Sequence, residues 1–153
     1  MSGTFNLKII TPERVVLDTV VSQVTATARD GQISILAHHE PLVTALGVDA
    51  LKYWEDGDEK SAAVIGGVLE VASQQTSESV EPTQDLVVTV ISDSAELAIE
   101  IDEARANQAK ARAEAEKAQK VDKLDLQVSE MALSRAIARL NAVKIAREAR
   151  RGR

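Results

Sequence analysis

The sequence predicts an α+β fold in which an all-β region precedes a pair of helices, and two observations carry this prediction. From residue 1 to 92, short apolar stretches rich in Val, Ile and Thr alternate with turn-forming residues, a pattern typical of a sandwich or barrel. From residue 102 to 153, Ala, Glu, Lys and Arg predominate, which is a strongly helical composition. We therefore expect a β domain over residues 1–92, a connection over 93–101 and helices over 102–153.

The predicted strands are short stretches in which apolar residues alternate with polar ones or follow one another between turns. The first two cover Phe5–Ile9 and Val15–Val24. Two hairpins are expected next, joining Thr25–Ala28 to Ile33–Leu36 and Leu51–Trp54 to Ala62–Ile65. Their turns, at Arg29–Gln32 and Glu55–Asp58, contain the Asp-Gly pairs that suit a tight turn. Val68–Val71 and Leu86–Ile91 complete the predicted strands.

Two segments inside the β region are expected to be irregular. Gly66-Gly67 precedes a strand and lacks the Lys-Ser/Thr pair and the helix of a phosphate-binding loop, so it predicts a bulge or a tight strand entry. Gln74–Gln84 is rich in Ser, Thr and Glu and contains one Pro. This composition predicts a long, mobile connection between the last two strands.

The helical region is expected to form an antiparallel hairpin, since a short break separates two helical stretches. Asp102 is the predicted N-cap of the first helix, Val121-Asp122-Lys123 interrupts the pattern, and the second helix covers Leu124–Arg150. The expected apolar face of the first helix consists of Ala104, Ala111, Ala115 and Ala118, and that of the second of Leu126, Leu133, Ile137 and Leu140, flanked by Ala136 and Val143. Because an alanine face buries little area, we expect a weakly packed hairpin that is able to leave its docking site.

Composition excludes several classes of function. The chain contains no Cys and only two His, which are adjacent, so a disulfide scaffold, a Cys nucleophile and a His-rich metal site are excluded. The absence of a run of 18 apolar residues predicts no membrane-spanning helix. Residues 1–134 carry 11 Lys+Arg against 23 Asp+Glu, whereas residues 135–153 carry 7 against 1. The basic end of this acidic chain predicts a negatively charged partner.

The only candidate acid–base pair combines His39 with Asp30 or Glu40. No nucleophile or oxyanion-stabilising element accompanies it, so the sequence predicts no catalytic site. We expect His39 to cap a loop beside Pro41 instead.

In order and spacing, the motifs of the chain resemble the epsilon subunits of bacterial F-type ATP synthases, the equivalents of the mitochondrial delta subunit. The stretch from Asp30 to Leu46 is similar to a family motif in its Gly, His, Pro, Leu and Thr positions, although Ser34 and Ala37 stand where the family has Gly and Pro. Residues 7–14, 66–71 and 88–91 resemble the family's strands, and residues 101–106 fit its Ile/Leu-Asp-x-x-Arg-Ala motif.

This resemblance implies a ten-stranded β-sandwich followed by a two-helix hairpin, in a non-catalytic subunit of the central stalk. The sandwich of such a subunit binds the gamma subunit and the c-subunit ring, and the hairpin inhibits ATP hydrolysis by meeting the alpha and beta subunits. The complex places it on the cytoplasmic side of the bacterial inner membrane, as a peripheral protein. We expect the sandwich contacts at Gly31, His39, Pro41, Leu42, Val68 and Leu69, and those of the basic end at Arg147, Arg150 and Arg151.

The resemblance also implies no obligatory cofactor or metal, but ATP as a regulatory ligand of the folded hairpin. Carried over by spacing, its site would consist of Glu96, Ile101, Asp102, Arg105, Arg112, Arg135 and Arg139. Arg135 and Arg139 lie one helical turn apart, so both guanidinium groups can hold a triphosphate. The simpler interpretation of Asp102 and Arg105 is an N-cap with an i, i+3 ion pair.

Two alternatives remain open at this point. One is a free-standing ATP-binding sensor of the same fold, which co-purification with a gamma subunit would distinguish. The other is a coiled-coil adaptor, which would require a longer heptad pattern than the second helix provides.

Overall fold

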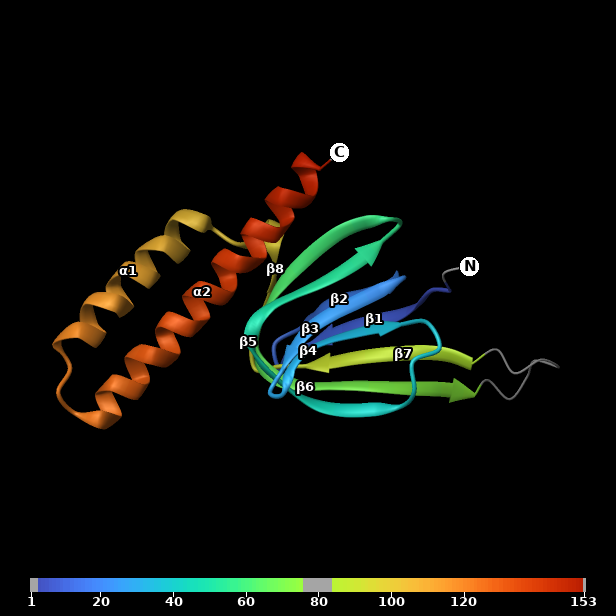
Figure 1. Cartoon of the computed structure of the whole chain (residues 1–153), viewed down its shortest axis with the longest axis horizontal. Helices are drawn as coiled ribbons and strands as arrows, with labels where there is room; N and C mark the ends of the chain where they lie inside the picture. The colour runs from blue at the N-terminus through green and yellow to red at the C-terminus, as the bar shows by residue number, and fades with distance from the viewer. Residues whose placement is uncertain (1–2, 76–83, 153) are drawn as a thin grey trace.

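The protein consists of a β-sandwich with a helical hairpin packed on one side, as Figure 1 shows. The computed structural model describes residues 3–75 and 84–152. Its strands are β1 Phe5–Ile10, β2 Val15–Val21, β3 Gln23–Ala28, β4 Gly31–Leu36, β5 Leu42–Glu55, β6 Asp58–Gln75, β7 Gln84–Ile91 and β8 Ala95–Leu97. A 3₁₀ turn, η1 (Ala98–Glu100), leads into helices α1 (Glu103–Gln119) and α2 (Lys123–Arg151).

Strands β5 and β6 are long enough to contribute to both layers of the sandwich. The strand order is β2-β1-β7-β6-β5-β3-β4, with β8 paired to β6. β7 pairs with the second half of β6, from Val68 onward, whereas β8 pairs with the first half at Ala62–Val64. One layer is therefore β2-β1-β7-β6-β5 and the other is β8-β6-β5-β3-β4. The expected sandwich is confirmed, and its ten strands are the eight observed ones when the halves of β5 and β6 are counted separately.

β6 changes layer at Gly66-Gly67, where the sequence predicted a bulge or a tight strand entry, and the pair lies within the continuous strand. Gly66 and Gly67 have φ angles of 68° and 114°, values that favour glycine over residues with a side chain. A Cβ atom on Gly67 would lie 2.1 Å from the carbonyl oxygen of Ile91. Only glycine therefore fits where β6 passes the end of β7.

The core lies between the layers and contains aliphatic side chains from both. Its fully buried members include Leu7 and Ile9 of β1, Ile35 of β4, Leu51 of β5 and Leu69 of β6.

Both predicted hairpin turns are confirmed. The predicted strand Val15–Val24 is wrong in its extent, because β2 ends at Val21 and β3 begins at Gln23. The strands predicted separately at Ala62–Ile65 and Val68–Val71 form the single strand β6.

Two predicted connections contain more structure than expected. Within residues 93–101, Ala95–Leu97 forms β8 and Ala98–Glu100 forms η1. The predicted connection Gln74–Gln84 is shorter, because β6 continues to Gln75 and β7 begins at Gln84; the rest of it lies outside the described residues.

The helices form the expected hairpin, and α2 lies between the sandwich and α1 (Figure 1). Asp102 caps α1, since its carboxylate accepts a hydrogen bond from the Arg105 amide at 3.1 Å. Asp122 caps α2 in the same way, through the Leu124 amide at 2.9 Å. The pair of caps explains why one helical composition is divided into two helices at this point.

The predicted apolar face of α1 is wrong. Ala104, Ala111, Ala115 and Ala118 are exposed, whereas Ala106 and Ala113 are buried. In α2, the buried residues are Ser129, Ala136, Ala138 and Ala142, while Leu126, Leu133 and Leu140 are half-buried and Ile137 is exposed. Small side chains occupy the contact because they let the helix axes come close, and the larger leucines lie at its margins.

Candidate functional site

The contact between the hairpin and the sandwich is small and separate from the main core. Its buried apolar residues are Ala63, Ala98 and Ala142, with Ala50, Ile101 and Ala146 partly buried around them. The buried Ser61 hydroxyl donates a hydrogen bond to the Ala142 carbonyl at 2.6 Å. The Asn141 amide group donates to the Asp49 carboxylate at 3.2 Å. Three alanines and a few polar contacts therefore hold α2 on the sandwich.

A cavity of about 370 Å³ lies where the hairpin meets the end of β8 and η1. Five of the seven predicted nucleotide-binding residues line it. These are Glu96, Ile101, Asp102, Arg105 and Arg139. They come from β8, from the linker between β8 and α1 (residues 98–102), from α1 and from α2. The cavity therefore has all its walls only while the hairpin is docked.

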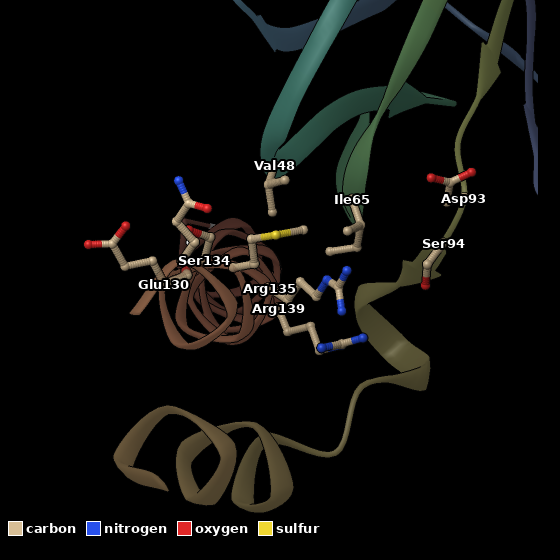
Figure 2. A pocket seen from close by; sticks show the side chains of 10 residues that line it. Val48, Ile65, Asp93, Ser94, Glu130, Ser134, Arg135 and Arg139 are labelled. Atoms are coloured by element: carbon tan, nitrogen blue, oxygen red, sulfur yellow. Dashed lines mark hydrogen bonds between the residues drawn. The ribbon is translucent and has the colours of Figure 1, made fainter. Parts of the chain in front are cut away.

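Arg139 lies between this cavity and a larger one of about 650 Å³, which Arg135 also borders. In Figure 2 both guanidinium groups point into the space between α2 and the sandwich residues Ile65 and Ser94. The Nε atom of Arg139 donates to the Glu96 carboxylate at 2.5 Å. Two cations at one entrance form an arrangement that can bind a polyphosphate, provided that Arg139 exchanges its carboxylate partner.

The remaining predicted residue, Arg112, lies apart from both cavities. It is on the exposed side of α1, where its Nε atom pairs with Glu116 one turn later at 2.9 Å. The structure therefore brings Arg112 to neither the other arginines nor the linker. Asp102 lines the smaller cavity and also serves as the α1 N-cap. The predicted cap is therefore confirmed, but it is made with the Arg105 backbone amide, and the described residues show no ion pair between the two side chains.

The sequence interpretation missed three residues of the smaller cavity, Glu100, Ala106 and Ala109. The Glu100 carboxylate receives two hydrogen bonds from the Arg14 guanidinium, at 3.1 and 2.7 Å. Hydrogen bonding from Arg14 holds the pKa of Glu100 below its usual range and raises that of Arg14. No sequence pattern connects positions 14 and 100, since the fold alone brings them together.

The predicted subunit-contact residues of the sandwich divide into exposed and buried groups. Gly31 lies at the β3–β4 turn, and His39 and Pro41 lie between β4 and β5. His39 caps its loop as expected, with Nδ1 2.8 Å from the Glu40 carbonyl oxygen. Leu42 is half-buried against the core, and Leu69 is fully buried within it, so Leu69 is a core residue and the prediction of a contact there is wrong.

An apolar patch covers part of the outer face of the β2-β1-β7-β6-β5 layer. Val68 on β6 lies opposite Ile91 on β7. Val43 on β5 is on the same face, opposite Glu70 and two residues along the strand from the partner of Val68. The exposed fractions of Val68, Ile91 and Val43 are 41%, 53% and 68%. Only Val68 was anticipated, because strand alternation alone does not show which outward residues lie side by side. Clustered exposed aliphatic residues of this kind mark a protein contact.

At the basic end, Arg147 is engaged within the hairpin, through an ion pair with Glu103 at the start of α1. Arg150 and Arg151 are exposed and border a cavity beside η1. No helix in the described part of the chain is long and apolar enough to cross a membrane. The same residues contain no group of three or more His, Cys, Asp or Glu arranged to hold a metal ion.

Comparison with known proteins places both parts of the chain in one family. Residues 4–98 match the model described as ATP synthase, Delta/Epsilon chain, beta-sandwich domain, and residues 100–144 match the corresponding long alpha-helix domain. The chain is 39% identical over 141 residues to the ATP synthase epsilon chain of Herpetosiphon aurantiacus, a match that covers 92% of this chain and 95% of that one. It is 41% identical over 138 residues to the ATP synthase epsilon chain of Symbiobacterium thermophilum, covering 90% and 91%.

A solved structure shares the fold. A chain of the Euglena gracilis mitochondrial ATP synthase, from a cryo-EM structure of its OSCP/F1/c-ring, superposes with a TM-score of 0.69 at 24% identity. The superposition covers 87% of this chain and 77% of that one.

Proposed function

Because the chain belongs to the epsilon chains of F-type ATP synthase, which are subunits of the central stalk, we propose that it restrains ATP hydrolysis by moving its helical hairpin. In this proposal the subunit itself is non-catalytic. The sandwich stays attached to the rotor and helps to couple rotation to ATP synthesis, while the hairpin alternates between a docked and an extended state.

The observation that carries this proposal is the separation of the two apolar cores. The sandwich core contains large aliphatic side chains, whereas the hairpin is held by a separate cluster of Ala63, Ala98 and Ala142. Undocking therefore exposes little apolar area and leaves the sandwich core intact. A two-state hairpin on a stable body is the physical requirement for a switch.

The surfaces of the molecule support the assignment of partners. The apolar patch of Val43, Val68 and Ile91 is suited to a stable contact with the gamma subunit. The loop with His39 and Pro41, at the end of the sandwich, is our candidate for the c-ring contact. The basic end, with Arg150 and Arg151, would meet acidic segments of the alpha and beta subunits after extension. These contacts would hold the chain at the cytoplasmic side of the bacterial membrane.

ATP is the regulatory ligand that we propose for the cavity around Arg139. Its walls come from both the linker and the two helices, so a ligand bound there stabilises the docked state by mass action. Phosphates would take the place of Glu96 on Arg139 and would reach Arg135 in the adjoining cavity, while Glu96 or Asp102 accepts hydrogen bonds from the adenine amino group.

The test is to lock the hairpin in its docked position. The chain has no Cys, so a double variant with Asp49→Cys and Asn141→Cys carries only the two introduced thiols. They replace side chains that contact each other in the docked structure. A short bifunctional thiol reagent then joins them before assembly with the other subunits. We expect the cross-linked complex to hydrolyse ATP faster than the untreated one, as should a complex whose chain ends at residue 133.

The two single-Cys chains, treated with the same reagent, are the matched controls and should leave the rate unchanged. A rate that is the same with the hairpin locked or free contradicts the inhibitory role. Failure of the chain to co-purify with a gamma subunit would favour the free-standing ATP sensor instead.

A further inference from the structure

The turn between β1 and β2 holds the segment that leads into the hairpin. Both terminal nitrogens of Arg14 donate to the two oxygens of Glu100, which lies 86 residues further along the chain. A bidentate arrangement of this kind fixes the relative orientation of its partners as well as their distance. Arg14 therefore attaches Glu100, the last residue of η1, to the β1–β2 turn.

Each partner is itself held by short-range hydrogen bonds. On the sandwich side, the Thr11 amide donates to the Arg14 carbonyl at 3.0 Å, and the Arg14 amide donates to the Thr11 hydroxyl at 3.3 Å. On the linker side, one Glu100 oxygen also accepts a hydrogen bond from the Leu97 amide at 3.2 Å. The pair thus connects two local structures that each have a defined backbone conformation.

The regular hydrogen bonding of the linker ends directly after this pair. The Ile101 amide donates to the Ala98 carbonyl at 3.3 Å, which closes η1. Ile101 and Asp102 are then extended, before α1 begins at Glu103. Glu100, Ile101 and Asp102 also line the cavity around Arg139. The position of that cavity wall consequently depends on the contact with Arg14.

We propose that Arg14 is a positioning residue, which acts through Glu100 to keep η1 on the sandwich whether the hairpin is docked or not. Ile101 and Asp102 then form the pivot of the hairpin, and the wall that Glu100 contributes to the cavity around Arg139 keeps its position. The part that concerns nucleotide rests on the proposed function, whereas the fixed linker does not. Because hydrogen bonding from Arg14 lowers the pKa of Glu100, the ion pair persists into more acidic solution than an ordinary Glu carboxylate would allow.

Hydrogen exchange in the full chain tests the fixed linker without any ligand. Arg14→Met keeps an unbranched side chain but removes both hydrogen bonds to Glu100. We expect the Leu97 and Ile101 amides to exchange about three- to tenfold faster, because each opening of η1 is then less costly. Lys8→Met is the matched control, since it removes the Lys8–Asp18 ion pair of the same two strands, which does not involve η1. Unchanged protection of both amides in Arg14→Met overturns the proposal.

Two further variants guard against a folding defect in Arg14→Met. Glu100→Gln removes the charge from the other side and should give the same faster exchange. Arg14→Lys keeps the charge but loses the bidentate geometry, so it should retain part of the protection. The same exchange rates in Arg14→Lys as in wild type would show that geometry has no role, which also contradicts the proposal.

Titration with ATP then separates this proposal from the proposed function. If wild type binds ATP, Arg14→Met should bind it about three- to tenfold more weakly, the range that a partly exposed bidentate pair supports, with the melting temperature of the sandwich unchanged. Equal ATP affinities of wild type and Arg14→Met would show that Arg14 does not position the cavity wall, and would overturn the part of the proposal that concerns nucleotide. If wild type binds no ATP, the nucleotide site fails, and the exchange rates alone decide on the linker.

Discussion

Gly67 shows how one residue permits the change of layer in β6. At this position the backbone has a φ of 114°, and the Ile91 carbonyl lies where a Cβ would be. Gly67→Ala should therefore destabilise the sandwich by about 2–4 kcal/mol, through backbone strain and a clash that only a backbone shift relieves. Urea unfolding measures the difference.

Gly47→Ala is the matched control for that substitution. A Cβ on Gly47 would be 3.6 Å from its nearest neighbour, the Thr27 carbonyl oxygen, which is an ordinary contact distance. We expect no loss of stability at this position. Similar losses for both variants would mean that the sandwich adjusts to a side chain at either glycine, and that the layer change does not depend on Gly67.

Tyr53 predicts how stability changes in alkaline solution. Burial raises the pKa of its hydroxyl to about 12, with smaller contributions from the carboxylates of Glu55 and Glu100. The folded state thus binds the phenolic proton more tightly than the unfolded state, whose pKa is near 10. This contribution is complete below pH 10 and is lost as the pH rises to 12.

Tyr53→Phe removes the titrating group, so its stability should decline less between pH 10 and 12 than that of wild type. Thermal unfolding across this range provides the measurement. Parallel pH profiles for the two chains would contradict the origin that we assign to the alkaline loss.

Among the elements, α2 carries the proposed switch, and Ala142 is its fully buried residue in the cluster with Ala63 and Ala98. Ala142→Leu should undock the hairpin, because the added side chain has no space beside Ala63 and Ala98. The sandwich should keep its stability, since its core does not include this cluster. Faster amide exchange in α2, with unchanged exchange in β1 and β7, is the expected result.

Ala132→Leu controls for the effect of a leucine in the same helix, because Ala132 is exposed. It should leave exchange in α2 unchanged. Cooperative unfolding of the sandwich in Ala142→Leu would instead show that hairpin and sandwich form one folding unit, against the mechanism that we propose.

The elements also show where sequence interpretation succeeds. Turn residues and the Asp102 cap have local causes, and both hairpin turns and the start of α1 were predicted correctly. Strand alternation located most of the strands but missed the break between β2 and β3. The buried face of α1 was predicted wrongly, because alanine recurs so often in this helix that several of its faces are equally apolar. Which alanines are buried depends on how α2 is placed, and that in turn depends on the sandwich.

The candidate site shows the same division between local and long-range causes. The resemblance identified five residues that do border one cavity, since they belong to motifs of fixed spacing. It also included Arg112, which lies elsewhere, and omitted Glu100. The contact of Glu100 with Arg14 results from the packing of segments 86 residues apart, and no periodicity or motif contains that information.

On the scale of the whole molecule, the basic end of α2 is docked on a body with an excess of acidic residues. Arg139 contacts Glu96 of β8, whereas the ion pair of Arg147 with Glu103 of α1 lies within the hairpin. Higher salt screens such partly exposed pairs, with a Debye length of about 8 Å at physiological ionic strength and about 3 Å at 1 M. We therefore expect amide exchange in α2 to accelerate as NaCl is raised, while exchange in the sandwich strands stays constant.

Glu96→Gln removes the sandwich carboxylate that faces Arg139, so the variant should respond less to salt than wild type does. A response of the same size in both chains would mean that the screened attraction lies elsewhere. Exchange in α2 that does not depend on salt at all would mean that the alanine contact alone holds the hairpin.

The passage of β5 and β6 through both layers has a mechanical consequence. In a sandwich of separate sheets, side-chain packing and the connecting loops oppose sliding of one sheet over the other. Here two continuous stretches of backbone connect the layers, so a shearing load is carried by covalent bonds as well. A component of a turning shaft is exposed to such loads at every step. In the mechanism that we propose, the sandwich therefore transmits torque as a stiff body while the hairpin undocks and docks again.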